Sequence, residues 1–510
     1  MEGLFRGPSI IFLKKSLTHI AFYSYIDLNM EKFYYERSNL LESEVNINFE
    51  ELLWMDDEQT SQWIDNMRNY ILSEWDGKGI PPTIGQNTDG IIKNFKKLRD
   101  YNVHKFLVKD EDTNEYNVIQ NYNKFASPVN QFFPTMLKTK IGTKKNATSI
   151  YDAFTDEYKD KFHKVIRRIL KRDSMYNWSK CLLQGEELPE HFFVVQHKKN
   201  AVESIYKTLT VEEIEKLDDK YKTNLPKELD DENYKFLVHK FELGQKLFPA
   251  GIQAFRLGLG QPAVNFPPLT ARWIYETYTK HIPLEETLNI YDPSSGWGGR
   301  ILGAMASNRN IHYIGTDPNT DNYIPELDMT RYEYVAEFFN NKCLETNSFW
   351  EEDKNTYHIF QEGSEHIGNH KDFQQYKGKL DLIFTSPPYF DREQYSADEE
   401  QSFRAYPQYE DWRDNFLKPT LENCYHSLRD DRYILWNIAD IKIGKDKYYP
   451  LEQDSIDILT ELGCEYQGKL KMLMTSMVGV DQSNVKNCVK VGGRYLKYEP
   501  IFLFHKPKKA

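Results

Sequence analysis

Short apolar runs alternate with longer amphipathic segments through the second half of this chain. From about residue 265, seven apolar runs of strand length recur, and segments such as 331–341, 409–428 and 451–462 lie between them with helical periodicity. Strands that alternate with helices predict right-handed βαβ units and a mainly parallel sheet, with any ligand bound at the carboxyl ends of the strands. A glycine pair, instead of a helix, separates the last two runs, which predicts a final antiparallel pair. The runs cover residues 288–291, 311–315, 357–360, 380–384, 433–438, 466–474 and 501–504.

The N-terminal half is patterned differently. Residues 201–245 are acidic and have helical periodicity, which predicts helix, until Pro226 and the glycines after residue 250 interrupt the pattern. This change places a domain boundary near residue 245. We therefore expect a mainly helical N-terminal region over 1–245 and an α/β domain over 246–510.

Positive charge is concentrated in part of that N-terminal region. Residues 91–172 contain 18 Lys or Arg and 9 Asp or Glu, whereas the whole chain has a net charge of −12. Aromatic residues are interleaved with the basic ones. Two interpretations stay open on composition alone, a solvated helical surface over an aromatic core or a face that binds nucleic acid. The overall charge excludes a uniformly basic coat.

Composition limits the class of protein further. The chain has 510 residues, of which 40% are hydrophobic and 14% aromatic, enough for a sizeable core. No stretch of the sequence approaches the roughly 20 apolar residues that span a bilayer. The five cysteines are scattered and form no CxxC pair, which predicts reduced thiols and no metal site. We therefore expect a soluble, cytoplasmic protein that does not bind a membrane.

A glycine-rich turn follows the strand predicted at 288–291 and leads into a helix. Such a turn lets a ligand approach the backbone and presents free N–H groups at a helix N-terminus. A dinucleotide fingerprint would require glycine where Ile301 stands, and Asp292 would repel a pyrophosphate but suits an ammonium group. The turn therefore predicts a zwitterionic, amino-acid-like ligand, and a purely structural turn is the alternative. Its sequence is Asp292-Pro293-Ser294-Ser295-Gly296-Trp297-Gly298-Gly299.

Polar residues also follow the next two strands. Asp317 lies 25 positions after Asp292, where a carboxylate can accept hydrogen bonds from both hydroxyls of a ribose. Taken alone, Asp317 would be a helix N-cap, but together with the glycine turn it favours a nucleoside. Gly363 and Ser364, after the third strand, are candidates to lie against an adenine ring.

The most specific motif follows the strand predicted at 380–384. Its sequence is Ser386-Pro387-Pro388-Tyr389-Phe390. The two prolines fix φ and remove two N–H donors, so a rigid stretch of outward-facing carbonyls follows a buried strand. The Ser386 hydroxyl and the Pro387 carbonyl suit the two hydrogens of an exocyclic amine, and Tyr389 suits a planar ring. The motif predicts a pocket for an amino-bearing base, and a proline-terminated strand with a packed tyrosine is the alternative.

With these motifs, residues 265–507 resemble the catalytic domain of the S-adenosylmethionine-dependent DNA amino-methyltransferases, which methylate adenine N6 or cytosine N4. The family's cofactor loop matches 292–299, its catalytic tetrapeptide matches 386–389, and the segment that covers the methionine end of its cofactor matches 265–269. The closing strand, 498–504, is similar as well. The resemblance implies a class I methyltransferase (Rossmann-like) fold with a seven-stranded mixed sheet, S-adenosyl-L-methionine as the cofactor and double-stranded DNA as the partner.

The resemblance also implies roles for individual residues. Ser386, Pro387, Pro388 and Tyr389 would hold the target base, which must leave the duplex. Within the family, serine at the first position is seen more often with cytosine N4 methylation, which favours N4-methylcytosine and leaves N6-methyladenine as the alternative. The implied cofactor-binding residues are Phe266, Pro267, Asp292, Pro293, Ser294, Gly296, Gly298, Asp317, Gly363 and Ser364.

The chain departs from the family in one respect. Phe384 lies only 85 positions after Gly299, which leaves no room there for a target-recognition domain. We therefore expect the basic N-terminal region to recognise DNA, together with a loop over 391–407 after the catalytic motif. The candidate nucleic-acid-binding residues are Phe390, Arg392, Arg404, Lys144, Lys145, Arg167 and Arg168.

Three other functions stay open. The enzyme could methylate RNA, because no motif identifies which sugar the substrate carries. The chain could also be an inactive nucleic-acid-binding protein with a methyltransferase fold, which the intact motifs disfavour, or carry a fused restriction nuclease, for which we find no acidic pair followed by E-x-K. As a DNA methyltransferase of a bacterium or phage, the protein would act at the nucleoid, with or without a partner restriction enzyme.

Overall fold

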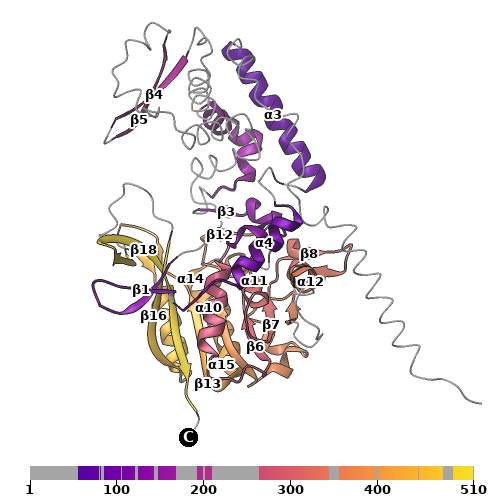
Figure 1. Cartoon of the computed structure of the whole chain (residues 1–510), viewed down its shortest axis with the longest axis vertical. Coiled ribbons are helices and arrows are strands. Elements are labelled where there is room, and N and C mark those ends of the chain that lie inside the picture. The colour runs from indigo at the N-terminus through magenta and orange to yellow at the C-terminus, as the bar shows by residue number, and fades with distance from the viewer. Residues whose placement is uncertain are drawn as a thin grey trace, which may run out of the picture. The chain divides into compact units, whose positions relative to one another are not determined.

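The computed structural model of the chain describes residues 56–79, 81, 86–104, 106–120, 125–142, 147–167, 192–198, 201–209, 264–343, 355–396, 399, 401–445, 447–474 and 486–508. The chain divides into two compact units (Figure 1). The described residues of the first unit lie within 86–136 and 264–510, and those of the second lie within 37–85 and 137–263. The domain boundary predicted near residue 245 lies outside the described residues.

A twisted mixed sheet forms the centre of the first unit. Its strands follow the order β16-β18-β13-β11-β6-β7-β10, in which β18 is antiparallel to both neighbours and the other pairs are parallel. The predicted class I methyltransferase fold, including its final antiparallel pair, is confirmed, but three further strands join these seven, so that the described sheet has ten strands and not the seven predicted. The strand bounds are β6 Leu288–Asp292, β7 Ile311–Thr316, β10 Thr356–Phe360, β11 Leu380–Thr385, β13 Leu428–Asn437, β16 Glu465–Leu473 and β18 Arg494–Lys506.

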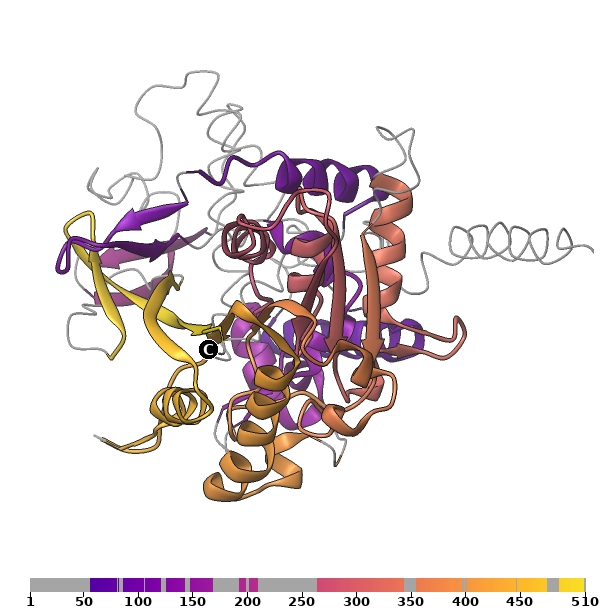
Figure 2. The ribbon, with the colours of Figure 1, turned by 90° about the horizontal axis from the view of Figure 1, so that it is seen from below.

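Helices cover both faces of this sheet. On one face, α10 (Pro268–Tyr278), α11 (Gly299–Met305) and α12 (Arg331–Cys343) pack in sequence, and on the other face α15 (Lys418–Ser427) packs against α16 (Leu451–Glu461) (Figure 2). The second layer buries a large aromatic and aliphatic core that includes Trp412, Leu421 and Trp436. The short helices α13 (Ser402–Ala405) and α14 (Tyr409–Trp412) precede α15. No helix among the residues that the structure describes is long and apolar enough to cross a membrane.

Residues far N-terminal to the sheet belong to the same unit. Helix α4 (Thr88–Arg99) packs on α12, where the rings of Phe95 and Phe339 stack with centroids 4.7 Å apart. The hairpin of β1 (Leu107–Lys109) and β2 (Tyr116–Ile119) extends the sheet, because β2 pairs in parallel with β16. The Lys471 ammonium binds the buried Asp110 carboxylate at this junction. Part of the N-terminal region that was predicted to be accessory therefore belongs to the unit that holds the sheet.

The second unit has its own core. Helix α3 (Asp57–Lys78) begins at the N-cap Asp56, whose side chain accepts a hydrogen bond from the backbone of Gln59. Its apolar face and the helical residues 159–167 contribute to one hydrophobic cluster. This cluster includes the aromatic side chains of Trp75, Phe154 and Phe162.

One predicted element of the second unit is wrong. Residues 201–209, expected to begin a helix, form strand β5 (Ala201–Leu209), which pairs antiparallel with β4 (Phe192–Lys198). Strand β5 contains β-branched and aromatic residues at Val202, Ile205, Tyr206 and Thr208, and such side chains favour strands over helices. The rest of the predicted helix, residues 210–245, lies outside the described residues.

Candidate active site

Asp292 closes strand β6 and is completely buried. Its Oδ2 accepts hydrogen bonds from Nε of Arg300 at 2.7 Å and from the Tyr313 hydroxyl at 2.6 Å, and its Oδ1 accepts one from Oγ1 of Thr385 at 2.7 Å. Burial alone would lower the pKa of Arg300, but the charge and hydrogen bond of Asp292 together with the neighbouring tyrosines raise that pKa. Protein donors thus occupy both oxygens of Asp292, and the carboxylate connects the ends of neighbouring strands. A ligand ammonium would have to compete with Arg300 for this carboxylate.

The glycine-rich turn after β6 is fastened by side chains from outside it. Asn265 donates from Nδ2 to the Trp297 carbonyl at 2.6 Å and accepts from the Gly299 N–H at 3.1 Å. Gly298 has φ +74°, and a Cβ there would lie 2.6 Å from the ring of Phe133. Glycine at 298 therefore serves both the backbone turn and close packing by Phe133. No motif pointed to Phe133, which lies far outside the region of resemblance.

Asp317, at the end of β7, accepts several hydrogen bonds. Its carboxylate binds the Tyr332 hydroxyl, Nδ2 of Asn322 at 3.1 Å and the Asn319 N–H at 2.9 Å. Burial raises the pKa of Asp317 to about 6, although these three hydrogen bonds act in the opposite direction. The Tyr332 hydroxyl, which has a single proton, is within hydrogen-bond distance of both this carboxylate and the Gly296 carbonyl, so one phenol lies between Asp317 and the glycine turn. The structure thus brings together the two motifs that the sequence assigned to one cofactor.

The other predicted cofactor residues fall into two groups. The first group borders the same turn. The centre of the Phe266 ring lies 5.2 Å from the centre of the Phe384 ring and 5.6 Å from the central carbon of the Arg300 guanidinium. Pro267 directly precedes α10. In the turn itself, the Pro293 carbonyl accepts from Oγ1 of Thr316 at 2.6 Å, and the Ser294 carbonyl accepts from Nη2 of Arg300.

The second group follows β10. The buried Ser364 side chain forms a hydrogen bond with Oγ1 of Thr420 on α15 at 3.0 Å, and the Ser364 carbonyl accepts from Nδ2 of Asn423 at 2.9 Å. A Cβ added to Gly363 would lie 2.5 Å from the Glu365 carboxylate. The Ser364 side chain is thus directed to the α15 layer.

The Ser386–Phe390 motif begins at the same edge, directly after Thr385, whose hydroxyl binds Asp292. Pro387 is buried, Ser386 and Tyr389 are partly exposed, and no hydrogen bond joins the Ser386 side chain to another described residue. Phe390, expected to stack on nucleic acid, is only 2% exposed. Its ring packs against Tyr409 at 5.5 Å and Tyr449 at 5.1 Å, so it belongs to the core beneath the motif and not to a binding surface.

Two partly buried glutamates, neither of which had a predicted role, lie beside the motif. The Tyr389 hydroxyl donates to Oε1 of Glu499 on β18, and the Tyr395 hydroxyl donates to Oε2 of Glu393. Burial raises the pKa of both carboxyls, and the charge of Glu499 adds to the shift at Glu393. The Tyr395 ring in turn lies 5.3 Å from that of Trp297 in the glycine turn. The only sequence signal for Glu499 is its place in the closing strand.

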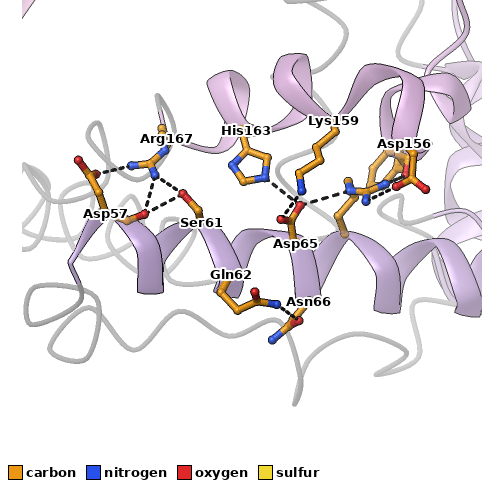
Figure 3. Close-up of polar contacts among 11 residues, drawn as sticks. Asp57, Ser61, Gln62, Asp65, Asn66, Asp156, Lys159, His163 and Arg167 are labelled. Atoms are coloured by element: carbon orange, nitrogen blue, oxygen red, sulfur yellow. Dashed lines mark hydrogen bonds and ion pairs between the residues drawn. The ribbon is translucent and has the colours of Figure 1, made fainter.

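The candidate nucleic-acid-binding residues are scattered. Arg392 and Arg404 are exposed on the segment that follows the catalytic motif. Arg167, in the second unit, binds the Asp57 carboxylate at 3.0 Å and the Ser61 hydroxyl at 2.8 Å (Figure 3). Its guanidinium therefore neutralises the Asp57 carboxylate on α3. In the same way, Nζ of Lys159 lies 2.7 Å from Oδ2 of Asp65 on that helix. Lys144, Lys145 and Arg168 lie outside the described residues.

Comparison with known proteins identifies part of the chain. The model of the DNA methylase family whose members modify adenine N6 or cytosine N4 matches residues 380–510, a segment that includes the Ser386–Tyr389 motif and the closing strand. No curated protein sequence matches the chain significantly.

Solved structures give more distant likenesses. A candidate DNA modification methylase from Thermus thermophilus, solved with S-adenosyl-L-methionine, is 15% identical, and the match covers 29% of this chain and 54% of that one with a TM-score of 0.20. A SAM-dependent methyltransferase from Agrobacterium tumefaciens is 13% identical over 49% of this chain and 65% of its own, with a TM-score of 0.30. The chain thus spans about half the length of the first of these methylases. Residues 380–510, about a quarter of the chain, thus match the DNA methylase family.

Proposed function

We propose that this protein is an S-adenosylmethionine-dependent DNA methyltransferase that modifies the exocyclic amine of a flipped base, cytosine N4 in preference to adenine N6. One observation carries the proposal: the Ser386–Tyr389 motif of a DNA methylase domain begins at the same sheet edge as the Asp292 turn and Asp317. Asp292 and Thr385 join the two halves of that edge through a hydrogen bond of 2.7 Å. A cofactor and a target base would therefore meet there.

The residues present fit S-adenosylmethionine. The Ser295 hydroxyl is buried in the turn and has no hydrogen-bond partner among the described residues, which leaves a polar atom for a ligand to satisfy. The Asp317 carboxylate would accept hydrogen bonds from the ribose hydroxyls, and the Gly296 and Gly298 turn would face the methionine moiety. When bound, S-adenosylmethionine supplies an electrophilic methyl group on a sulfonium.

The chain's own residues orient the target amine. The Ser386 hydroxyl and the Pro387 carbonyl accept the two amine hydrogens, which draws the nitrogen toward tetrahedral geometry and frees its lone pair for in-line attack. Tyr389 stacks on the base and offsets the cost of unstacking it, with a contribution of roughly 1–3 kcal/mol. The contribution of these residues is orientation and electrostatic complementarity, without a covalent intermediate.

Mass spectrometry of nucleosides tests the proposal. Unmethylated duplex DNA is incubated with the protein and methyl-labelled S-adenosylmethionine, digested and analysed beside a matched RNA substrate. We expect labelled N4-methylcytosine in the DNA. Labelled N6-methyladenine would keep the reaction and overturn the choice of base, and label in RNA alone would overturn the choice of nucleic acid. Binding of cofactor with no transfer to either would favour the inactive nucleic-acid-binding protein.

A further inference from the structure

The hydrogen bond from Tyr389 to Glu499 crosses the active edge of the sheet. Tyr389 follows β11 and Glu499 lies on β18, and β13 stands between these two strands. At the end of β13, Asn437 donates from Nδ2 to the Pro500 carbonyl at 2.9 Å. The catalytic motif is thus tied to the last strand over the end of a third strand.

The rest of the motif is already fixed by other means. Pro387 and Pro388 have restricted φ angles, and Phe390 is anchored in the core. Neither the prolines nor Phe390 constrains the Tyr389 side chain. Its hydroxyl is instead held by the hydrogen bond to Glu499. A tyrosine pinned at the hydroxyl keeps its ring in one plane, which lowers the entropy lost when a base stacks on it.

We propose that Glu499 is a positioning residue for base capture, which holds the Tyr389 ring in the orientation that receives the flipped base. This inference rests on the proposed function, because Tyr389 needs a base to stack on. A carboxylate is a stronger acceptor than a neutral group, so the charge of Glu499 strengthens the hydrogen bond that holds Tyr389. It accounts for a partly buried glutamate at a place where a neutral residue would cost less to desolvate.

The surroundings of Glu499 set its response to pH. Burial raises its pKa, and the Tyr389 hydrogen bond and the Lys497 charge on the same strand oppose that shift. The segment after β11 adds the Glu393–Tyr395 pair, and on β16 the residue opposite Glu499 is the neutral Met472. Lys471, the next residue on β16, is engaged by Asp110. Acidification should protonate Glu499, weaken its hold on Tyr389 and lower the efficiency of methylation.

A double-mutant cycle tests this role. Glu499→Gln keeps the shape and a neutral acceptor, and Tyr389→Phe removes the hydroxyl but keeps the ring. We expect Glu499→Gln to lower kcat/KM for unmethylated plasmid DNA about tenfold, the scale that separates charged from neutral hydrogen bonds. The acid limb of the pH–rate profile attributable to Glu499 should disappear, while the Kd for S-adenosylmethionine stays unchanged and reports that the fold is intact. In the Tyr389→Phe background, Glu499→Gln should have no further effect on kcat/KM.

The chain offers a matched control. On α12, Glu337 accepts a hydrogen bond from the Tyr357 hydroxyl at 2.6 Å, the same pair of groups away from the catalytic motif. Glu337→Gln should leave kcat/KM and its pH profile unchanged. If Glu499→Gln behaves like this control, or lowers kcat/KM by the same factor with and without the Tyr389 hydroxyl, the positioning role is overturned while the proposed function stands. If the wild-type protein transfers no methyl group to DNA, the proposed function itself fails.

Discussion

The turn after β6 and the motif after β11 meet at one sheet edge, but they are held in different ways. The turn depends on polar side chains: a buried carboxylate at Asp292 is satisfied by Arg300, Tyr313 and Thr385. The motif depends on its backbone, through two prolines, and on the buried ring of Phe390. The Ser386 hydroxyl takes no part in this support. Damage to the turn should therefore reduce stability, whereas damage at Ser386 should reduce rate alone.

The largest effect should come from breaking the buried ion pair. Arg300→Met removes the cation and leaves Asp292 buried with only neutral donors, which should cost about 3–5 kcal/mol in the free energy of unfolding. Urea denaturation of the purified protein measures this. Arg413, which pairs with Asp414 at the surface at 2.7 Å, provides the control, and Arg413→Met should cost less than about 1 kcal/mol. Equal stability of the two variants would contradict the structural role of Asp292.

Two adjacent residues offer a sharper form of the same comparison. Ser386→Ala should lower kcat about a hundredfold, by analogy with the loss of one hydrogen-bonding group at a transition state, and leave stability within about 0.5 kcal/mol. Thr385→Val, one position earlier, removes a donor to the buried Asp292 and should cost about 1–3 kcal/mol of stability. Single-turnover methylation and urea denaturation of both variants separate the two signatures. A Ser386→Ala variant that loses stability but not rate would break the comparison.

The sequence predicted the residues at the carboxyl ends of the strands better than it predicted the side chains that hold those residues in place. Alternating apolar runs identified the sheet, and Asp292, Asp317 and Ser386 could be placed because each follows a strand, where topology alone brings side chains together. Phe133 and Glu499 could not be placed, because their roles depend on contacts across more than a hundred residues that no local pattern records. Phe390 failed for a related reason, since an aromatic residue beside a motif looks the same whether it faces the core or a ligand. Residues 201–209 show that β-branched and aromatic residues can favour a strand hairpin within a segment that has helical periodicity.

A pH titration of cofactor binding should reveal the Asp317 carboxylate. Asp317 has a pKa of about 6, and a ribose needs its ionised form as acceptor. The affinity for S-adenosylmethionine should therefore be flat above about pH 7 and weaken up to about tenfold per unit below pH 6, a dependence that Asp317→Asn removes. Isothermal titration calorimetry at several pH values measures it. An unchanged slope in Asp317→Asn would place the titrating group elsewhere.

The same carboxyl acts on stability with the opposite sign. Its folded pKa is raised, so between the ordinary value of 3.8 and about 6 the folded state binds more protons than the unfolded state. The burial of the charge costs stability fully above pH 6, and acidification from pH 7 to pH 5 relieves part of that cost at this residue. Relative to Asp317→Asn, the wild type without cofactor should gain stability over the pH range in which it loses cofactor affinity.

The smallest effect concerns the surface and tests whether the comparison of structural and functional residues extends to DNA. Helix α4 packs on α12 through Phe95 and exposes Lys93, Lys96 and Lys97. Exposed ammonium groups of this kind are suited to binding DNA phosphates. Replacing all three with glutamine should reduce the slope of log Kd for DNA against log salt by up to about 3, with cofactor affinity unchanged. The matched control replaces Lys371, Lys377 and Lys379, three exposed lysines in the segment that precedes β11. If both triple variants change the slope equally, the attraction is a property of overall charge and α4 does not contribute a DNA-binding face.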